Sequence, residues 1–183
     1  SGATAAVTGS AAVTATDQQI PGINVSTLDD DTLTLTVTLT DVAGNTGANA
    51  TDTITKDTVA PAGYSVSLDQ SYINATNQTA ASFTFTGAEV GATYNYQIDD
   101  TNGGTAPITG TAAITSANQQ VTGIDLSTLN DDTLTLTVTL TDAAGNTGAN
   151  ATDTITKDTV APSGYSVSLD QSVINAANQA AAS

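Results

Sequence analysis

The side chains of this sequence that can do chemistry are almost all carboxylates. The 183 residues include 18 Asp and Glu, two basic residues (Lys56 and Lys157) and no His or Cys. Without His or Cys, the usual routes of general acid–base and thiol catalysis are closed. Adjacent carboxylates such as Asp131–Asp132 or Asp99–Asp100 have the residue types of a glycosidase pair, but neighbouring side chains in a strand point apart. We therefore expect no enzyme activity.

Oxygen ligands without nitrogen or sulfur suit a hard cation, and calcium takes about six to eight oxygens from carboxylates, carbonyls and water. Whether these carboxylates converge depends on the elements that carry them. For any single Asp the alternative is a turn role, because Asp and Asn side chains bond to nearby backbone N–H groups.

An internal repeat of 101 residues organises the chain. Residues 1–82 align without a gap on residues 102–183, and 63 of the 82 aligned pairs are identical. This period is too long for a solenoid unit and fits a whole small domain. The stretch TITKDTVAP occurs in both copies, at 53–61 and 154–162, and each copy holds one of the two Lys residues.

The Pro of each TVAP stretch marks the expected domain boundary, since proline cannot donate to a sheet ladder. On this phasing residues 61–161 form one complete domain. Residues 1–60 are the later strands of an earlier, incomplete repeat, and residues 162–183 are the first strands of a later one. The chain is therefore expected to be an interior fragment of a longer protein, since it also opens with no signal-like segment.

Alternation of apolar residues with Thr and Ser predicts strands inside the complete domain. The clearest is TLTLTVTLT at 133–141, with Leu134, Leu136, Val138 and Leu140 on one face and Thr on the other. Other strands are expected in YSVSL, SFTFT, TYNYQI, APITGTAAIT, QQVTGIDL and NATDTIT. Seven short strands in about 100 residues predict an all-β, immunoglobulin-like sandwich, so the chain is a linear array of such domains.

The loops of this sandwich gather at two ends, called here the start pole and the end pole. At the junction of two repeats, the end pole of one faces the start pole of the next, and the Coulomb repulsion of their acidic groups favours a divalent cation between them. The residues expected to ligate calcium at this junction are Asp29, Asp30, Asp31, Asp57, Glu89, Asp142 and Asn146. The end pole and exit of the complete domain are expected to supply further calcium ligands, namely Asp69, Asp99, Asp100, Asp131, Asp132 and Asp158. Lys56 and Lys157 are expected to form exposed ion pairs worth under about 1 kcal/mol, or to guard a strand edge.

The motifs GAEVGATYNYQI, LTVTLTDAAGNTG and TITKDTVAP resemble the bacterial Ig-like repeats of large type I-secreted, RTX-type surface adhesins. The resemblance covers the whole chain. The family includes biofilm adhesins. The resemblance implies an extracellular stalk at the cell surface, in which neighbouring repeats contact one another and calcium stiffens the junctions. The glycine-rich calcium repeats found elsewhere in such adhesins do not occur in this sequence.

Charge and hydropathy exclude several other classes of function. A net charge of −16 argues against nucleic acid and anionic membrane surfaces. No apolar run approaches the roughly 20 residues of a membrane span, and no small-molecule substrate is expected. The rival hypotheses are a domain that binds a glycan or a protein, and a fibre subunit whose incomplete ends complement neighbouring chains by strand addition.

Overall fold

A computed structural model describes residues 4–181 of the chain. Over these residues all regular structure is β, which confirms the predicted class. The strands are β1 (Asp31–Val37), β2 (Ala50–Lys56), β3 (Ser65–Leu68), β4 (Ala81–Thr86), β5 (Thr93–Asp100), β6 (Ile108–Ala113), β7 (Gln120–Ile124), β8 (Thr133–Thr141) and β9 (Ala151–Thr156). No helix in this part of the chain has the length and apolarity to cross a membrane.

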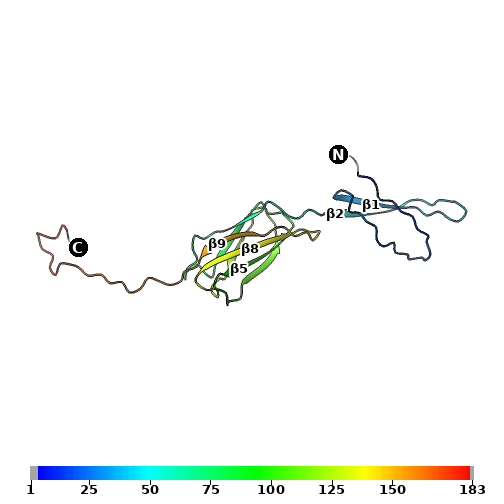
Figure 1. The fold of residues 1–183 in the computed structure, drawn as a ribbon. Helices are drawn as coiled ribbons and strands as arrows, with labels where there is room; N and C mark the ends of the chain where they lie inside the picture. Colours follow the sequence, from blue (N-terminus) through cyan, green and yellow to red (C-terminus); the bar gives the residue numbers. More distant parts are fainter. Residues whose placement is uncertain (1–3, 182–183) are drawn as a thin grey trace.

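Strands β3 to β9 form a two-layer sandwich. One sheet has the order β3-β4-β7 and the other the order β6-β5-β8-β9, and all neighbouring strands in them are antiparallel. Sequence neighbours β4 and β5 therefore lie in different layers, as they do in immunoglobulin-like domains. In Figure 1 this sandwich is the central body, with the β1–β2 hairpin on one side and the C-terminal segment on the other.

The core follows from the alternation of side chains along each strand. In β8, the residues Leu134, Leu136, Val138 and Leu140 are fully buried, whereas the Thr residues between them face outward. Phe83 and Phe85 of β4 are equally buried from the opposite sheet. Burying a side chain of this size stabilises a fold by about 1.5–3 kcal/mol, so the side chains buried between the two sheets hold them together.

Four aromatic rings join the two layers. Phe83 packs edge-on against Phe85 and against Tyr96, with ring centroids 5.4 Å apart in both pairs. Tyr94 lies beside Phe85 at the same separation. The Tyr96 ring covers Gly110 of the neighbouring strand, where an added Cβ would be 2.4 Å from the ring carbon Cε1. Gly110 thus provides the space that the ring occupies.

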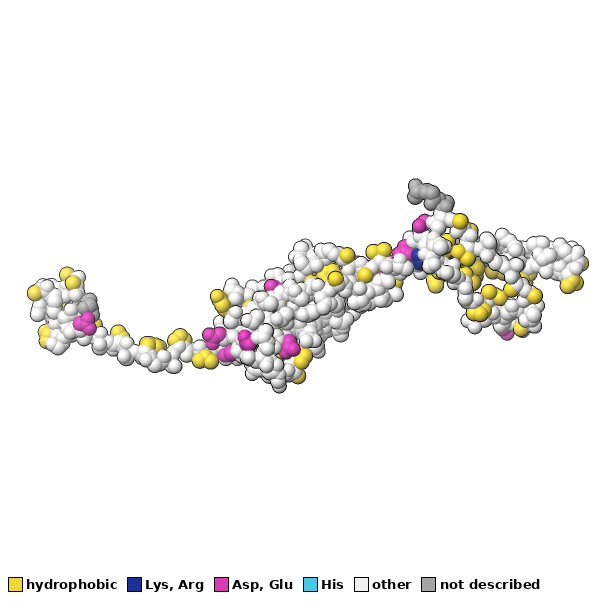
Figure 2. All heavy atoms as spheres, viewed as in Figure 1, with side chains coloured by type: hydrophobic (Ala, Val, Ile, Leu, Met, Phe, Trp, Pro, Cys, Tyr) yellow, Lys and Arg dark blue, Asp and Glu magenta, His cyan; other side chains and the backbone are white. Residues whose placement is uncertain are grey.

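The segments on either side of the sandwich are largely exposed. β1 and β2 form an antiparallel hairpin, and residues 4–30 contain no strand. Leu35 of this hairpin is 52% exposed, although it occupies the same place in the repeat as the fully buried Leu136. Figure 2 shows hydrophobic side chains gathered on the surface of the N-terminal part of the chain, which contains β1 and β2. Residues 162–181 contain no strand.

Candidate functional site: the junction between repeats

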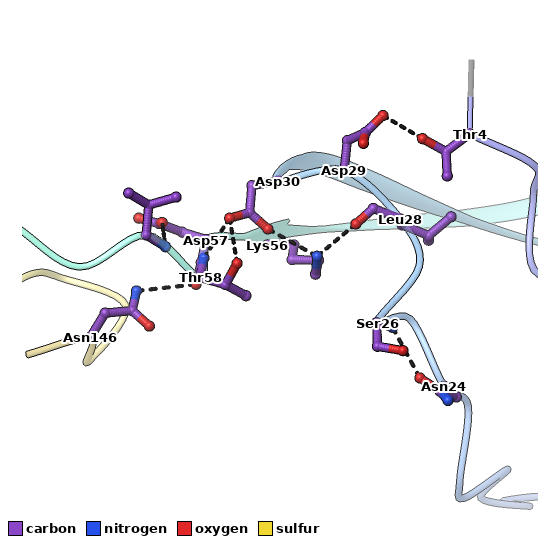
Figure 3. Close-up of polar contacts among 11 residues, drawn as sticks. Thr4, Asn24, Ser26, Leu28, Asp29, Asp30, Lys56, Asp57, Thr58 and Asn146 are labelled. Atoms are coloured by element: carbon purple, nitrogen blue, oxygen red, sulfur yellow. Dashed lines mark hydrogen bonds and ion pairs between the residues drawn. The ribbon is translucent and has the colours of Figure 1, made fainter. Parts of the chain in front are cut away.

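Residues 57–64, called here the linker, connect β2 to β3 and are bonded to the segment that precedes them. The carboxylate of Asp30 accepts hydrogen bonds from the backbone N–H and from the hydroxyl of Thr58, both at 2.7 Å (Figure 3). The same carboxylate forms an ion pair with Lys56 at 2.9 Å. The Thr58 hydroxyl, followed by Lys56, lowers the pKa of Asp30 from 3.8 to about 2. The first turn of the linker is therefore held by the loop before β1.

The linker is also bonded to the sandwich that follows it. The side-chain amide of Asn146 donates to the backbone carbonyl of Asp57 at 3.2 Å, as Figure 3 shows. Asn146 is oriented by Asp142, whose carboxylate accepts from both its amide and its backbone N–H at 2.8 Å. Asn146 also lowers the pKa of Asp142. Gly145 completes this tight loop at a φ of 95°, a conformation open mainly to glycine.

The same loop exists, already formed, in the first repeat. Asp41 accepts from the amide of Asn45 at 2.8 Å and from its backbone N–H at 2.8 Å. This match means that the loop takes its shape from its own residues rather than from contact with a linker. Each repeat therefore presents a preformed amide donor at its start pole.

Close backbone packing fixes the end of the linker. A Cβ built on Gly148 would lie 2.3 Å from the carbonyl oxygen of Pro61, and Pro61 is buried. The Tyr64 hydroxyl donates to the carbonyl of Ala149 and accepts from the N–H of Leu140 at 3.2 Å. Pro61 and Tyr64 thus attach the linker to the end of the β8–β9 hairpin.

At the end pole of the complete domain, Lys157 is buried, with 3% of its surface exposed. Its ammonium donates to three backbone carbonyls, those of Leu126 at 3.0 Å, Ser127 at 3.4 Å and Leu129 at 2.5 Å. An ammonium has three donors, so these bonds satisfy it fully. The expectation of an exposed ion pair was wrong for Lys157, because the β7–β8 loop offers carbonyls that enclose the charge. For Lys56 the ion pair is present, with Asp30, but it is half-buried rather than exposed.

Other acidic residues of the end pole hold loops and the outgoing chain. Asp131 accepts from the N–H and hydroxyl of Thr159 at 2.8 Å, which repeats the bonds between Asp30 and Thr58. The Thr159 N–H and hydroxyl lower the pKa of Asp131. Asp100 is buried and accepts from Thr105 at 2.5 Å and from the N–H of Asn130 at 3.0 Å.

The remaining predicted ligands are dispersed. Asp29 accepts from the Thr4 hydroxyl and Asp132 from the Thr101 hydroxyl. Asp69 is bonded to Thr84 and Gln120 on the outer face of its own sheet. The carboxylates of Asp31, Asp57, Asp99 and Asp158 each accept from a backbone N–H one or two residues ahead, and Glu89 has no side-chain hydrogen bond in the described chain.

Taken together, residues 4–181 contain no group of three or more acidic side chains placed to hold a metal ion. The structure does bring Asn146 to Asp57, and it puts Asp30 beside Lys56 and Thr58. Most of the carboxylates that were predicted to bind calcium already accept hydrogen bonds from nearby donors of the chain. The arrangement as it stands therefore does not fit calcium, and the calcium ligands stay a prediction.

Sequence reasoning missed three positioning residues, namely Tyr64 and Gly148 at the junction and Asp153 within the sandwich. Asp153 of β9 accepts from the N–H of Leu68 at 2.8 Å and so connects the two sheets at their edge. Its inward position was readable from the alternation, since it is paired with Leu136. Gly148 gave no signal, because its role depends on a backbone 87 residues earlier in the chain.

The outer face of the four-stranded sheet carries a shallow groove of about 410 Å³. Asn95, Gln97 and Asn150 line it, together with Thr residues, and these three amides have no side-chain hydrogen bond within the described chain. Its one aromatic lining residue, Tyr96, packs its ring on the core residue Phe83. Thr, Asn and Gln side chains thus make up most of this surface.

No protein-family model matches the chain, and no curated protein sequence matches it. Among solved structures, the chain is similar to the crystal structure of a tetra-tandem repeat in the extending region of a large adhesion protein. The identity is 24% and the TM-score is 0.46, over 74% of this chain and 34% of the other. The chain thus spans about a third of the length of that structure.

Proposed function

We propose that this chain is an extender segment of a bacterial cell-surface adhesin, and that it holds a distal binding domain away from the cell. The motifs described in the sequence support this, since they resemble the stalk repeats of such adhesins. Near-identity of successive repeats also supports it, because a repeat used as a spacer needs the same joint each time. The observation that carries the proposal is a linker bonded on both sides, through Thr58 to Asp30 and through Asp57 to Asn146.

A stalk needs joints that resist bending, and these contacts supply resistance without a large interface. A neutral hydrogen bond contributes about 0.5–1.5 kcal/mol net, and bonds to charged groups contribute more. The two bonds to Asp30, the bond to Asn146 and the packing on Gly148 act on Thr58, Asp57 and Pro61, all in one short segment. Only Val59 and Ala60 lie between the bonded parts, so the linker has few free dihedral angles.

Calcium at the junction, which the sequence predicts, is the alternative to a joint held by hydrogen bonds alone. An ion there would take oxygens from Asp57, Asp142 and Asn146, with Asp30 as a further carboxylate. In the present arrangement Asn146 donates its amide to Asp57 and Asp142, so its side chain would have to turn before its oxygen faced an ion. When bound, calcium would supply charge neutralisation between the acidic ends of two repeats.

Small-angle X-ray scattering of the 183-residue chain tests the extender function. We expect a scattering curve typical of an extended particle, with a maximum dimension that is independent of protein concentration. A compact particle, in which the segments before and after the sandwich fold back on it, would contradict the proposal. Growth of the particle with concentration would favour the fibre hypothesis, and selective binding on a glycan array would favour the binding-domain hypothesis.

A further inference from the structure

We propose that the ammonium group of Lys157 is the resident cation of the end pole, in the place where the sequence predicts calcium. The inference concerns the assembly of one domain and does not depend on the adhesin function. Its basis is the contrast between an end pole whose carboxylates suggest a metal and a structure in which a lysine ammonium is enclosed by carbonyls at that same pole.

The surroundings of Lys157 have the chemistry of a cation site. Three carbonyl oxygens of one loop, those of Leu126, Ser127 and Leu129, converge on the ammonium. Carbonyl oxygens of a loop are also typical calcium ligands. Asp125 and Asp131 lie near enough for the ammonium charge to lower the pKa of their carboxyl groups, although their own hydrogen bonds lower it more. Their hydrogen bonds go to Ser127 and Thr159, so they remain near the ammonium without contacting it.

The burial of Lys157 depends on a complete domain. The backbone around Lys157 is bonded to two segments. The N–H of Lys157 donates to the carbonyl of Asp132, and the N–H of the next residue, Asp158, donates to the carbonyl of Ile73. The 73–78 segment also covers the carbonyl loop, where Gln78 accepts from Leu126. Among the described residues no segment equivalent to 73–78 covers Lys56, whose side chain is 16% exposed and whose ammonium contacts one carbonyl, that of Leu28, and the carboxylate of Asp30. The enclosed site is thus a property of the finished sandwich.

The position of Lys157 connects the cation to the junction. By drawing the 126–129 carbonyls together, it fixes the start of the turn that contains Asp131. Asp131 in turn holds Thr159 of the outgoing chain. Lys157 is therefore a positioning residue for the next linker, and each repeat carries its own tethered cation in the KDT sequence.

The two lysines of the chain allow a direct comparison within one protein. The native 183-residue chain would be treated with a reagent that acylates amines. The rate of modification at each Lys would be measured by peptide mass spectrometry. We expect Lys157 to react at least about tenfold more slowly than Lys56, because modification requires local opening of the end pole. Equal rates would show that Lys157 is not enclosed and would overturn the proposal.

A second experiment separates a tethered cation from a bound metal. Thermal unfolding would be followed for the native chain, for Lys157→Met and for Lys56→Met, each in a chelator and in millimolar calcium. We expect the native chain to unfold at the same temperature in both buffers. We expect Lys157→Met to lose at least about 10 °C, because three carbonyls lose their partner and two of them, those of Leu126 and Leu129, are buried. Lys56→Met, the matched control, should change the transition of the sandwich by less than about 3 °C.

Two results would overturn the inference. One is a native chain that loses many degrees in the chelator, since the end pole would then need a metal. The other is a Lys157→Met variant that keeps the native transition. If Lys157→Met does not fold, the modification rates and the effect of the chelator on the native chain still decide the question.

Discussion

Replacing Gly148 by Ala tests the docking of the linker on the sandwich. The added Cβ would lie 2.3 Å from the carbonyl oxygen of Pro61 and 3.2 Å from the Tyr64 ring. Real Cβ atoms do not approach a backbone oxygen so closely, so Pro61 must move away from the β8–β9 hairpin. Overpacking of this kind typically costs about 1–3 kcal/mol. For a domain of this size that corresponds to a loss of roughly 4–24 °C in the unfolding midpoint.

The repeat provides a matched control at Gly47, which has the same flanking residues, TGAN. No linker packs there, and a Cβ would meet only the carbonyl of Leu39 at 3.7 Å. Urea unfolding, followed by circular dichroism, should show Gly148→Ala destabilised by the stated amount and Gly47→Ala within about 0.5 kcal/mol of the native chain. Equal, small effects of the two substitutions would refute the close packing of the linker on the hairpin.

Three further predictions concern the core and the junction. Leu136→Ala should cost about 2–5 kcal/mol in urea unfolding, because Leu136 is fully buried, while Leu35→Ala should cost little, because Leu35 is 52% exposed. Gly110→Ala should push the Tyr96 ring off its site and cost about 1–3 kcal/mol, a result that unchanged stability would contradict. Because the pKa of Asp30 is lowered to about 2, its ionised form stabilises the folded state. This stabilisation is fully present above about pH 3.8 and is lost as the pH falls through about 2. The Thr58 amide signal in an NMR titration should therefore shift near pH 2, and a midpoint near pH 4 would show that Asp30 is not held by Thr58 and Lys56.

The strands were predictable because the sequence alternates so regularly. The run 133–141 places its apolar residues on one face in the sequence and in the structure. The same period of two explains why Asp99 and Asp100 separate, since Asp99 is paired with Thr135 on the outer face and Asp100 with Leu134 on the core face. The local sequence pattern was sufficient to predict the faces of the strands, because each strand residue is paired in a regular ladder with a residue of the neighbouring strand.

The junction was only partly predictable. Grouping of loops at two poles anticipated that Asn146 lies near Asp57, which the structure shows. The chemistry at that contact was not anticipated, because an Asn side chain offers an oxygen to a metal and an amide to a carbonyl equally well. The burial of Lys157 had no signature in residue types, since its three partners are backbone carbonyls of a loop.

The central claim is that the linker holds successive repeats at a fixed angle through its own hydrogen bonds. Because the chain has no Cys, the substitutions Thr53→Cys and Thr154→Cys allow two spin labels at equivalent sites of β2 and β9. The distance distribution between the labels, measured by double electron–electron resonance in chelator, tests the claim most directly. We predict one narrow distribution, unchanged by calcium and broadened when Asp30→Ala and Asn146→Ala are added. A broad distribution in chelator that narrows only with calcium would contradict it.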